Sequence, residues 1–383
     1  MLDEDQAEME LDLIWKDFSA RHWQIGRIFD ERFAEVAEDV GLATATVSPV
    51  KQRLIGAYFC HEYSYAAAAL MNPSVVPHPD QSGLEAGDLR FVMSMRAVGE
   101  GHISSVAFRE GIITADGTLR LWPQSGPAMA AVVDDRHRMS PDGAVTVHRQ
   151  SDCVISNSVL FPVTEAQRNG VEDLRLVLFT HEDGTQEYIG TYTAYSGRDI
   201  RSEMLRTRDF ESFCLEPLRG RAARNKGMAL FPRKVDGRYL VIGRQDGKNL
   251  TLLSSDTLDQ WDDEGQILLR PAFPWELVQM GNCGSPIECD EGWLLLTHGV
   301  GAMRKYSLGA ALLDRDDPSK VLGRTACPIL TAAESDREGY VPNVVYTCGA
   351  MPVGKQLFIP YGISDSAIGF AMVPVAELLG LMI

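Results

Sequence analysis

The sequence predicts an all-β domain that follows a helical extension. From Pro79 to the C-terminus, short apolar segments alternate with turn signals such as Asp116-Gly117. Clear hairpin patterns occupy residues 286–299 and 355–373, and no long helical pattern interrupts the series. A glycine-rich turn followed by an apolar strand recurs about once per 50 residues, which favours a propeller over a barrel or a sandwich.

The first part of the chain is predicted to be helical. Residues 5–41 carry apolar side chains mostly three or four positions apart, with charges between them, which is typical of one or two amphipathic helices. A further helix begins at Ser48 and Pro49, an N-cap and a proline at the first helical position, and is expected to run to Leu70. The predicted units are therefore a helical extension, residues 1–74, and a β domain, residues 75–383.

The apolar side of this extension needs a partner. A stripe of Trp15, Phe18, Phe29 and Phe33 would be exposed on an isolated helix, so it is expected to dock on the β domain or on a neighbouring subunit. The sequence thus allows a homo-oligomer formed through the N-terminal helices.

Composition and charge exclude several classes of partner. The 383 residues are 45% hydrophobic, which is enough for a large core, and the net charge of −17 would repel nucleic acid and anionic membrane surfaces. The N-terminus is acidic and lacks the pattern of a secretory signal, and no apolar run approaches the ~20 residues of a membrane span. The seven cysteines are scattered and never spaced as CxxC. These features predict a cytoplasmic protein with reduced thiols.

Motifs for metals and nucleotides are not found. The segment 61–64, HEYS, lacks the second histidine of a zinc-binding HExxH pattern, and GEGHIS lacks the lysine of a P-loop. We therefore expect no metal and no organic cofactor.

Eight segments, in matching order between residues 90 and 371, carry a resemblance to a known family. They are RFVMSMRAVGEGH, GVEDLRLV, YTAYSG, NKGMALFPRKVDGRY, GSPIECDEGWLLLTHGV, YSLGAALLDRDDPSKVLGR, REGYVPNVVYTCG and YGISDSAIGFA. Together they resemble glycoside hydrolase family 130, whose members are five-bladed β-propellers that act on β-mannosides. Most are inverting phosphorylases and some are hydrolases. The resemblance implies a five-bladed propeller that cleaves β-linked manno-oligosaccharides, with phosphorolysis to α-mannose 1-phosphate as the leading expectation.

The resemblance places the catalytic acid at Asp173. In the family, an EDPR-type motif supplies the carboxylic acid that protonates the departing sugar oxygen, and in phosphorylases the proton is thought to pass through a sugar hydroxyl. Here the motif reads EDLR, with Leu174 in place of proline. Taken alone, an Asp soon after Gly170 would be interpreted as a turn residue.

A phosphorylase must hold phosphate with cations. Lys226, Arg244 and His298 stand at the family's three anion-binding positions, with lysine replacing the first arginine. Lysine attracts phosphate as a point charge but lacks the bidentate fork of arginine. Arg304 and Lys305 could add charge nearby.

The sugar-binding residues implied by the same match are Arg96 and Asp365, which would hold the mannosyl unit at the cleavage site. Asn72, His102, Tyr192 and Tyr340 are further candidates, although the two tyrosines are equally well explained as packing residues of strands. The expected ligands are thus an oligosaccharide and inorganic phosphate, the latter as a co-substrate.

Two alternatives remain open at this point. An inverting hydrolase acting on β-1,2-linked mannosides would need a second carboxylate as the base for water, for which Glu100 and Glu203 are the candidates. The other alternative is a propeller without catalysis, used for protein interaction or carbohydrate binding; the presence of Asp173 argues against it.

Overall fold

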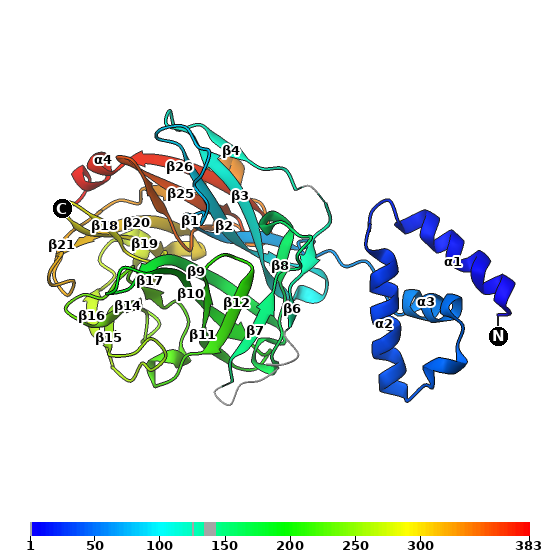
Figure 1. Ribbon diagram of the computed structural model, residues 1–383. Coiled ribbons are helices and arrows are strands. Elements are labelled where there is room, and N and C mark those ends of the chain that lie inside the picture. The colour runs from blue at the N-terminus through cyan, green and yellow to red at the C-terminus, as the bar shows by residue number, and fades with distance from the viewer. Residues whose placement is uncertain (1, 125, 134–142) are drawn as a thin grey trace. The chain divides into compact units, whose positions relative to one another are not determined.

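The structure is a computed structural model that describes residues 2–124, 126–133 and 143–383. The chain divides into two compact units, which are coloured by residue number in Figure 1. The first unit comprises residues 1–64 with residues 124–127, and the second comprises residues 65–123 with residues 128–383.

The first unit contains three helices, α1 (Glu4–Phe18), α2 (Ile25–Val40) and α3 (Pro49–Tyr58). The α1 helix begins with a reciprocal cap, in which the Gln6 backbone N–H donates to the Asp3 carboxylate and the Asp3 N–H donates to the Gln6 side chain. The predicted start of α3 is confirmed, because the Ser48 hydroxyl accepts a hydrogen bond from the Lys51 N–H.

The helices pack through part of the predicted apolar stripe. Phe29 and Phe33 are each only 5% exposed, and α2 contacts α3 so closely that a Cβ on Gly56 would stand 1.9 Å from the Phe29 carbonyl oxygen. Trp15, by contrast, is 41% exposed. The prediction that four aromatic residues form one docking face is therefore wrong, because two of them form the interior of this unit. Self-association stays a prediction.

The predicted extension of α3 to Leu70 is also wrong. The helix ends at Tyr58, and Ala69 and Leu70 begin the strand β1 (Ala69–Pro77), where they pair with Val98 and Ala97. Alanine favours helices by only a few tenths of a kcal/mol, and pairing within a sheet outweighs that preference. Residues 69–74, which the sequence assigned to the extension, thus form strand in the second unit.

The second unit is built of β-sheets. The largest has twelve strands. Nine follow the path β1, β2, β3, β9, β10, β11, β12, β7, β6, and the other three, β4, β5 and β8, pair beside this path. Their bounds are β2 (Leu89–Val98), β3 (Ser104–Ile113), β4 (Leu119–Leu121), β5 (Met129–Ala130), β6 (Val132–Val133), β7 (Val145–His148), β8 (Ser158–Leu160), β9 (Gly170–Thr180), β10 (Gln186–Tyr195), β11 (Ile200–Thr207) and β12 (Ser212–Pro217). A single parallel pair, Ser104 with Gly170, joins β3 to β9. The sheet therefore consists of two largely antiparallel halves.

Three smaller sheets follow in sequence. The first has β13 (Ala229–Leu230), β14 (Tyr239–Gly243), β15 (Leu250–Ser255) and β16 (Gln266–Leu269). The second has β17 (Gln279–Asn282), β18 (Ile287–Cys289), β19 (Gly292–Val300), β20 (Tyr306–Leu313), β21 (Val321–Arg324) and β22 (Leu330–Thr331). The third has β23 (Val345–Tyr346), β24 (Met351–Val353), β25 (Gln356–Ile363) and β26 (Ala367–Pro374), after which α4 (Val375–Gly380) ends the chain. The predicted hairpins at 286–299 and 355–373 are confirmed as β18–β19 and β25–β26.

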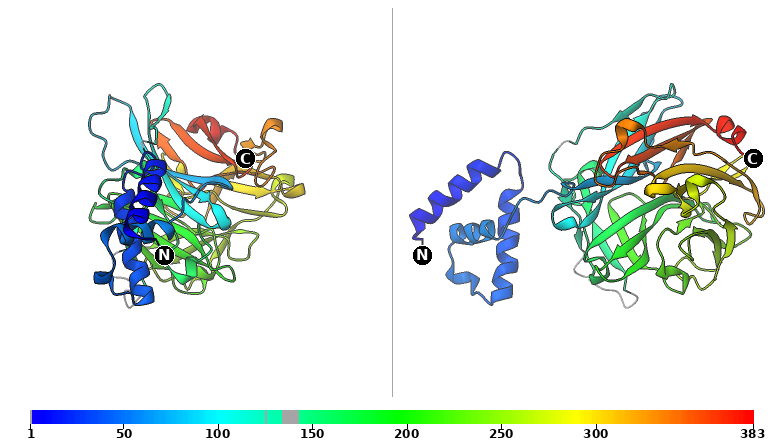
Figure 2. Two further views of the ribbon diagram at one scale, coloured as in Figure 1. Left: turned by 90° about the vertical axis from the view of Figure 1, so that its right-hand side faces the viewer. Right: turned by 180° about the vertical axis from the view of Figure 1, so that it is seen from behind.

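The two halves of the large sheet and the three smaller sheets touch in sequence order. Within the large sheet β1 contacts β9, and between sheets β10 contacts β13, β14 and β15 contact β17, β20 contacts β23, and β25 contacts β1. Figures 1 and 2 show the sheets of this unit following one another around a common centre, with the colour passing from cyan through green and yellow to red. At the closing contact, the Cys348 N–H donates to the Pro73 carbonyl at 2.7 Å. The mainly β class predicted for this part of the chain is confirmed.

Two further observations bear on the sequence predictions. All seven cysteines are free thiols. Within the described ranges, every helix is either too short or too polar to cross a membrane.

Candidate active site

A cavity of about 200 Å³ lies where the four sheets meet. Strands or adjoining loops of every sheet contribute to its wall. The lining residues are Asn72, Arg96, Asp173, Arg175, Lys226, Gly227, Arg244, Gly281, Asn282, His298, Arg304, Tyr306, Val344, Tyr346 and Asp365. Seven residues that the sequence singled out as site residues are among them: Asn72, Arg96, Asp173, Lys226, Arg244, His298 and Asp365.

A β-bulge presents Asp173 to this cavity. In the pairing of β9 with β10, Asp173 and Leu174 together face the single residue Tyr192. The Leu174 side chain is buried in the apolar core, while Asp173 adopts a left-handed backbone with φ of 56°. Leucine at the family's proline position is therefore accommodated by core packing.

Two other candidate residues share this unusual backbone. Asn72, at an irregularity in β1, has φ of 51°, and Asp365, in the β25–β26 turn, has φ of 53°. Residues other than glycine adopt such values at a cost of about 1–3 kcal/mol, and they gather at functional sites. Together with Arg304, whose φ is 57°, four left-handed residues other than glycine line one cavity, which supports a functional role for it.

The Asp173 carboxylate is held by two donors. Asn72 Nδ2 donates to Asp173 Oδ1 at 2.6 Å, and Arg96 Nη1 donates to the same oxygen at 3.2 Å. Arg96 also donates to Glu172 Oε1 at 2.7 Å and to Ser104 Oγ at 3.0 Å. The guanidinium of Arg96 thus bridges two neighbouring carboxylates and fixes their orientation.

These contacts set the protonation of the acidic residues. Burial alone would raise the pKa of Asp173, but the charges of Arg96 and Arg175 and the hydrogen bond from Asn72 outweigh burial and hold the pKa well below its usual range. Burial and the charge of Asp173 raise the pKa of Asp365 to about 6. Asp173 is therefore ionised at neutral pH.

Arg175 lies beneath Asp173 in a network that the sequence analysis missed. Its Nη1 donates to the Asp173 carbonyl at 2.8 Å, its Nε to Asn282 Oδ1 at 3.1 Å and its Nη2 to the Tyr346 hydroxyl at 2.8 Å. The Asn282 amide in turn donates to the Ile242 carbonyl at 3.0 Å. The one available signal was the position of Arg175 at the end of the EDLR motif.

The predicted anion-binding residues lie together, but His298 differs from the expectation. Lys226, Arg244 and Arg304 line the cavity as cations. Burial, followed by the charges of Arg244 and Arg175, lowers the pKa of His298 to about 3, so its ring is neutral at pH 7. Its Nδ1 lies 3.2 Å from the Asn282 carbonyl oxygen, which assigns the proton to Nδ1 and leaves Nε2 as an acceptor. The imidazole offers hydrogen bonding and no charge.

Three predicted residues lie outside the cavity wall, on the surface. His102 and Tyr340 contact each other, with the Tyr340 hydroxyl 3.4 Å from His102 Nδ1. The Tyr340 N–H donates to Ser366 Oγ at 2.7 Å, which places this pair near the turn that carries Asp365. Glu100 is exposed in the short 3-10 helix η2 (Glu100–His102).

Tyr192 and Glu203 are buried in the sheet, away from the cavity wall. The Tyr192 hydroxyl and Gln167 Nε2 each donate to Glu203 Oε2 at 2.7 Å, and Arg201 Nε donates to Glu203 Oε1 at 2.7 Å. For Tyr192 the packing interpretation is therefore the better one. Neither Glu203 nor Glu100 stands where a base could activate water beside Asp173.

The small cavity sets a hydrogen-bonded carboxylate among cationic side chains, an arrangement that suits an enzyme acting on a small polar substrate. The comparison with known proteins agrees with this class. The chain belongs to glycoside hydrolase family 130, because residues 141–383 match the sequence profile of that family, which is described as β-1,4-mannooligosaccharide phosphorylase.

Individual relatives are similar over more than half of the chain. A 1,2-β-oligomannan phosphorylase of Thermoanaerobacter sp. (strain X514) is 33% identical over 252 residues, which are 63% of this chain and 79% of the relative. A β-1,2-mannobiose phosphorylase of Listeria innocua serovar 6a is 32% identical over 57% of this chain and 62% of its own length. The solved structure of a β-1,2-mannobiose phosphorylase from Listeria innocua, in complex with β-1,2-mannobiose, superposes with a TM-score of 0.54 at 24% identity. It covers 82% of this chain and 92% of that one, which shows a shared fold.

Proposed function

We propose that the protein is an inverting phosphorylase that cleaves β-linked manno-oligosaccharides and releases α-mannose 1-phosphate. One observation carries the proposal: Lys226, Arg244 and Arg304 line the cavity that holds Asp173, and the two candidate bases of a hydrolase do not. The names of the relatives, which are mannoside phosphorylases, support the same reaction.

Asp173 is the proposed proton donor. It is ionised at neutral pH because the neighbouring cations lower its pKa. A phosphate dianion beside Lys226 and Arg244 would offset these charges, so that Asp173 accepts a proton when phosphate is bound. The proton then passes to the departing glycosidic oxygen, through a sugar hydroxyl by the route that the family resemblance implies. A phosphate oxygen attacks the anomeric carbon from the opposite face, which inverts the β-linkage to an α-phosphate.

The remaining lining residues are assigned to positioning. Arg96, with its bonds to Glu172 and Asp173, orients the acid. Asp365 would accept hydrogen bonds from hydroxyls of the mannosyl unit. The Asn72 amide donates one hydrogen bond to Asp173 and would form a second with the sugar. His298 would donate no charge to phosphate but can accept a hydrogen bond from a phosphate O–H at Nε2.

For the architecture, we propose five blades. The two halves of the large sheet, divided at the Ser104–Gly170 pair, count as two, and the three smaller sheets complete the set. The sequential contacts that end with β25 against β1 support a closed propeller. We also propose a cytoplasmic enzyme, where phosphate is available. The reaction requires no metal or organic cofactor, since phosphate itself is the nucleophile.

Product analysis tests the reaction. The protein is incubated with β-1,2- and β-1,4-linked manno-oligosaccharides, with and without inorganic phosphate, and the products are followed by ³¹P NMR. We expect α-mannose 1-phosphate, formed only when phosphate is present. Free mannose released at the same rate without phosphate would refute the proposal and favour the inverting hydrolase.

A further inference from the structure

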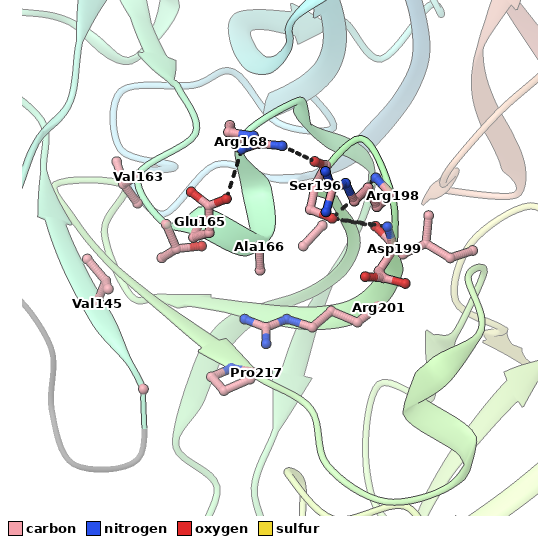
Figure 3. A pocket seen from close by; sticks show the side chains of 14 residues that line it. Val145, Val163, Glu165, Ala166, Arg168, Ser196, Arg198, Asp199, Arg201 and Pro217 are labelled. Carbon is pink, nitrogen blue, oxygen red and sulfur yellow. Dashed lines mark hydrogen bonds and ion pairs between the residues drawn. The ribbon is translucent and has the colours of Figure 1, made fainter.

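A second cavity, of about 1050 Å³, shares no lining residue with the catalytic cavity. Figure 3 shows it from close by, with the Arg201 side chain extended between Ala166 and Pro217. Its wall combines charged and polar residues with apolar ones. They are Gly143, Val145, Val163, Thr164, Glu165, Ala166, Arg168, Ala194, Ser196, Arg198, Asp199, Ile200, Arg201 and Pro217. We refer to it as the Arg198 cavity.

The Arg198 cavity is lined by residues at the end of β10 and the start of β11, the end of the sheet at which Asp173 lies in β9. In the strand register, Val171 of β9 pairs with Ala194 of β10, and Ala194 pairs with Arg201 of β11. Neighbouring strands lie about 4.8 Å apart, so the backbone of Arg201 is about 10 Å from the backbone of Val171, two strands away. Val171 precedes Asp173 by two residues. The residue after Arg201, Ser202, donates through Oγ to the Asn225 carbonyl at 2.6 Å, directly before Lys226. A short oligosaccharide can span this separation.

The charges of the Arg198 cavity are nearly balanced. Arg168 is paired with Glu165 at 3.1 Å and also donates to the Ser196 carbonyl. Arg201 is paired with the buried Glu203, and among the described residues the Arg198 guanidinium has no side-chain partner. The wall itself carries three arginines and two carboxylates, Glu165 and Asp199, and the buried Glu203 behind the wall offsets the charge of Arg201. Such a wall offers both donors and acceptors without a net attraction for anions.

This lining suits a neutral, hydroxyl-rich ligand. Guanidinium and carboxylate groups hydrogen-bond to hydroxyls, while Val163, Ala166 and Pro217 provide apolar surface for the C–H faces of a sugar ring. The combination of a few convergent polar groups with apolar walls is characteristic of binding sites for small molecules.

The two cavities differ in volume, and therefore in how much of an oligosaccharide each can hold. At about 200 Å³ the catalytic cavity is smaller than typical ligand sites of about 300–1000 Å³, so it can hold little more than a terminal sugar and an anion. The other units of a chain must lie outside it. At about 1050 Å³, the Arg198 cavity has room for more than one of them.

We propose that the Arg198 cavity binds the distal units of a neutral oligosaccharide whose terminal unit occupies the catalytic cavity. The inference rests on the proposed function, and it adds a preference for chains longer than a disaccharide. Arg198 is the specificity-determining residue of this region, because its guanidinium is available to sugar hydroxyls.

Two variants test it, Arg198→Ala and Ala166→Trp, of which the second fills the cavity without removing a charge. Arg208→Ala is the matched control, since Arg208 is an exposed arginine at the opposite end of β11. Arg201 is left intact because its loss would strand the buried carboxylate of Glu203. The measurement is the ratio of kcat/KM for longer manno-oligosaccharides to kcat/KM for mannobiose, at saturating phosphate.

We expect this ratio to fall about fivefold in Arg198→Ala, the value of one lost hydrogen bond, and to fall further in Ala166→Trp. It should stay unchanged in Arg208→Ala. An unchanged ratio in both cavity variants would overturn the inference while leaving the reaction established. A rise in the KM for phosphate without an effect of chain length would also overturn it, because the cavity would then be an anion site.

Calorimetric titration with the same oligosaccharides gives a readout that does not depend on turnover. We expect wild type and Arg208→Ala to bind longer chains more tightly than mannobiose, and Arg198→Ala to lose about fivefold of that affinity. If no mannoside is cleaved under any condition, the proposed function fails, and the inference about the Arg198 cavity is then tested by this titration alone. Equal affinities of wild type and Arg198→Ala would then refute the inference.

Discussion

The substitution Asp365→Asn should stabilise the protein at neutral pH while it impairs catalysis. The pKa of Asp365 is raised from 3.8 to about 6 by burial and by the charge of Asp173. A carboxyl group with a raised pKa in the folded state contributes most to stability below pH 3.8, where it is protonated in both states. This contribution is lost as the pH rises through 6, because the unfolded chain ionises more readily.

The magnitude follows from the same two values. A difference between 3.8 and about 6, at about 1.4 kcal/mol per pH unit, corresponds to about 3 kcal/mol. Because Asp365 faces a cavity that water can enter, we expect about half of this to be measured. Asparagine has the shape of the protonated acid and cannot ionise, so it removes the free-energy cost of holding a charged carboxylate at this position in the folded state.

Urea unfolding from pH 4.5 to pH 8, followed by near-UV circular dichroism, provides the assay. The buried Trp261 and Trp293 report on the β unit. The advantage of Asp365→Asn should grow from about 0.5 kcal/mol at pH 4.5 to about 1.5 kcal/mol or more at pH 8. The control is Asp236→Asn, an aspartate in the exposed turn between residues 235 and 238. A variant less stable than wild type at pH 8, or an advantage independent of pH, would refute the reasoning.

Three further predictions concern the acid, the anion site and the unit boundary. Asp173→Asn should lower kcat by at least about a hundredfold with the fold and sugar binding intact, and a variant that retains more than a tenth of wild-type activity would exclude Asp173 as the acid. Arg244→Ala should raise the KM for phosphate at least tenfold while oligosaccharide binding changes little. The control is Arg224→Ala, which replaces an exposed arginine and should leave both quantities unchanged. Equal effects of Arg244→Ala on both substrates would contradict its phosphate role. Removal of residues 1–64 should leave a folded β unit, whereas removal of residues 1–74 should abolish folding because it deletes most of β1. Circular dichroism and activity assays distinguish the folded deletion variant from the unfolded one.

The sequence predicted the parts of the site that lie in contiguous motifs. Asp173 and Asp365 were recognisable because each stands in a short motif that resembles one of the family, whereas the bulge that presents Asp173 was not predicted. Arg175, Asn282 and Tyr346 were missed, because their network joins strands that are far apart in the chain and meet only through the packing of separate sheets.

Burial was the other quantity that sequence could not supply. Glu203 and Asp365 are both carboxylates near the ends of strands, yet one is closed inside the sheet and the other faces the cavity. The charge of His298 likewise depends on two arginines from other strands. In the N-terminal part, the alanine-rich stretch before Leu70 favoured a helix in local terms, and pairing with β2 reversed that preference.

The contact between β1 and β25 has a consequence for folding during synthesis. Asn72 is among the first residues of the β unit to leave the ribosome, whereas Asp365 is among the last, and the bond from Cys348 to Pro73 can form only when both ends are free. Pairings of such long sequence separation form slowly. A nascent chain therefore cannot complete the wall of the cavity before Asp365 has left the ribosome, and a chain that stops before this residue has most of its sheets but an incomplete cavity.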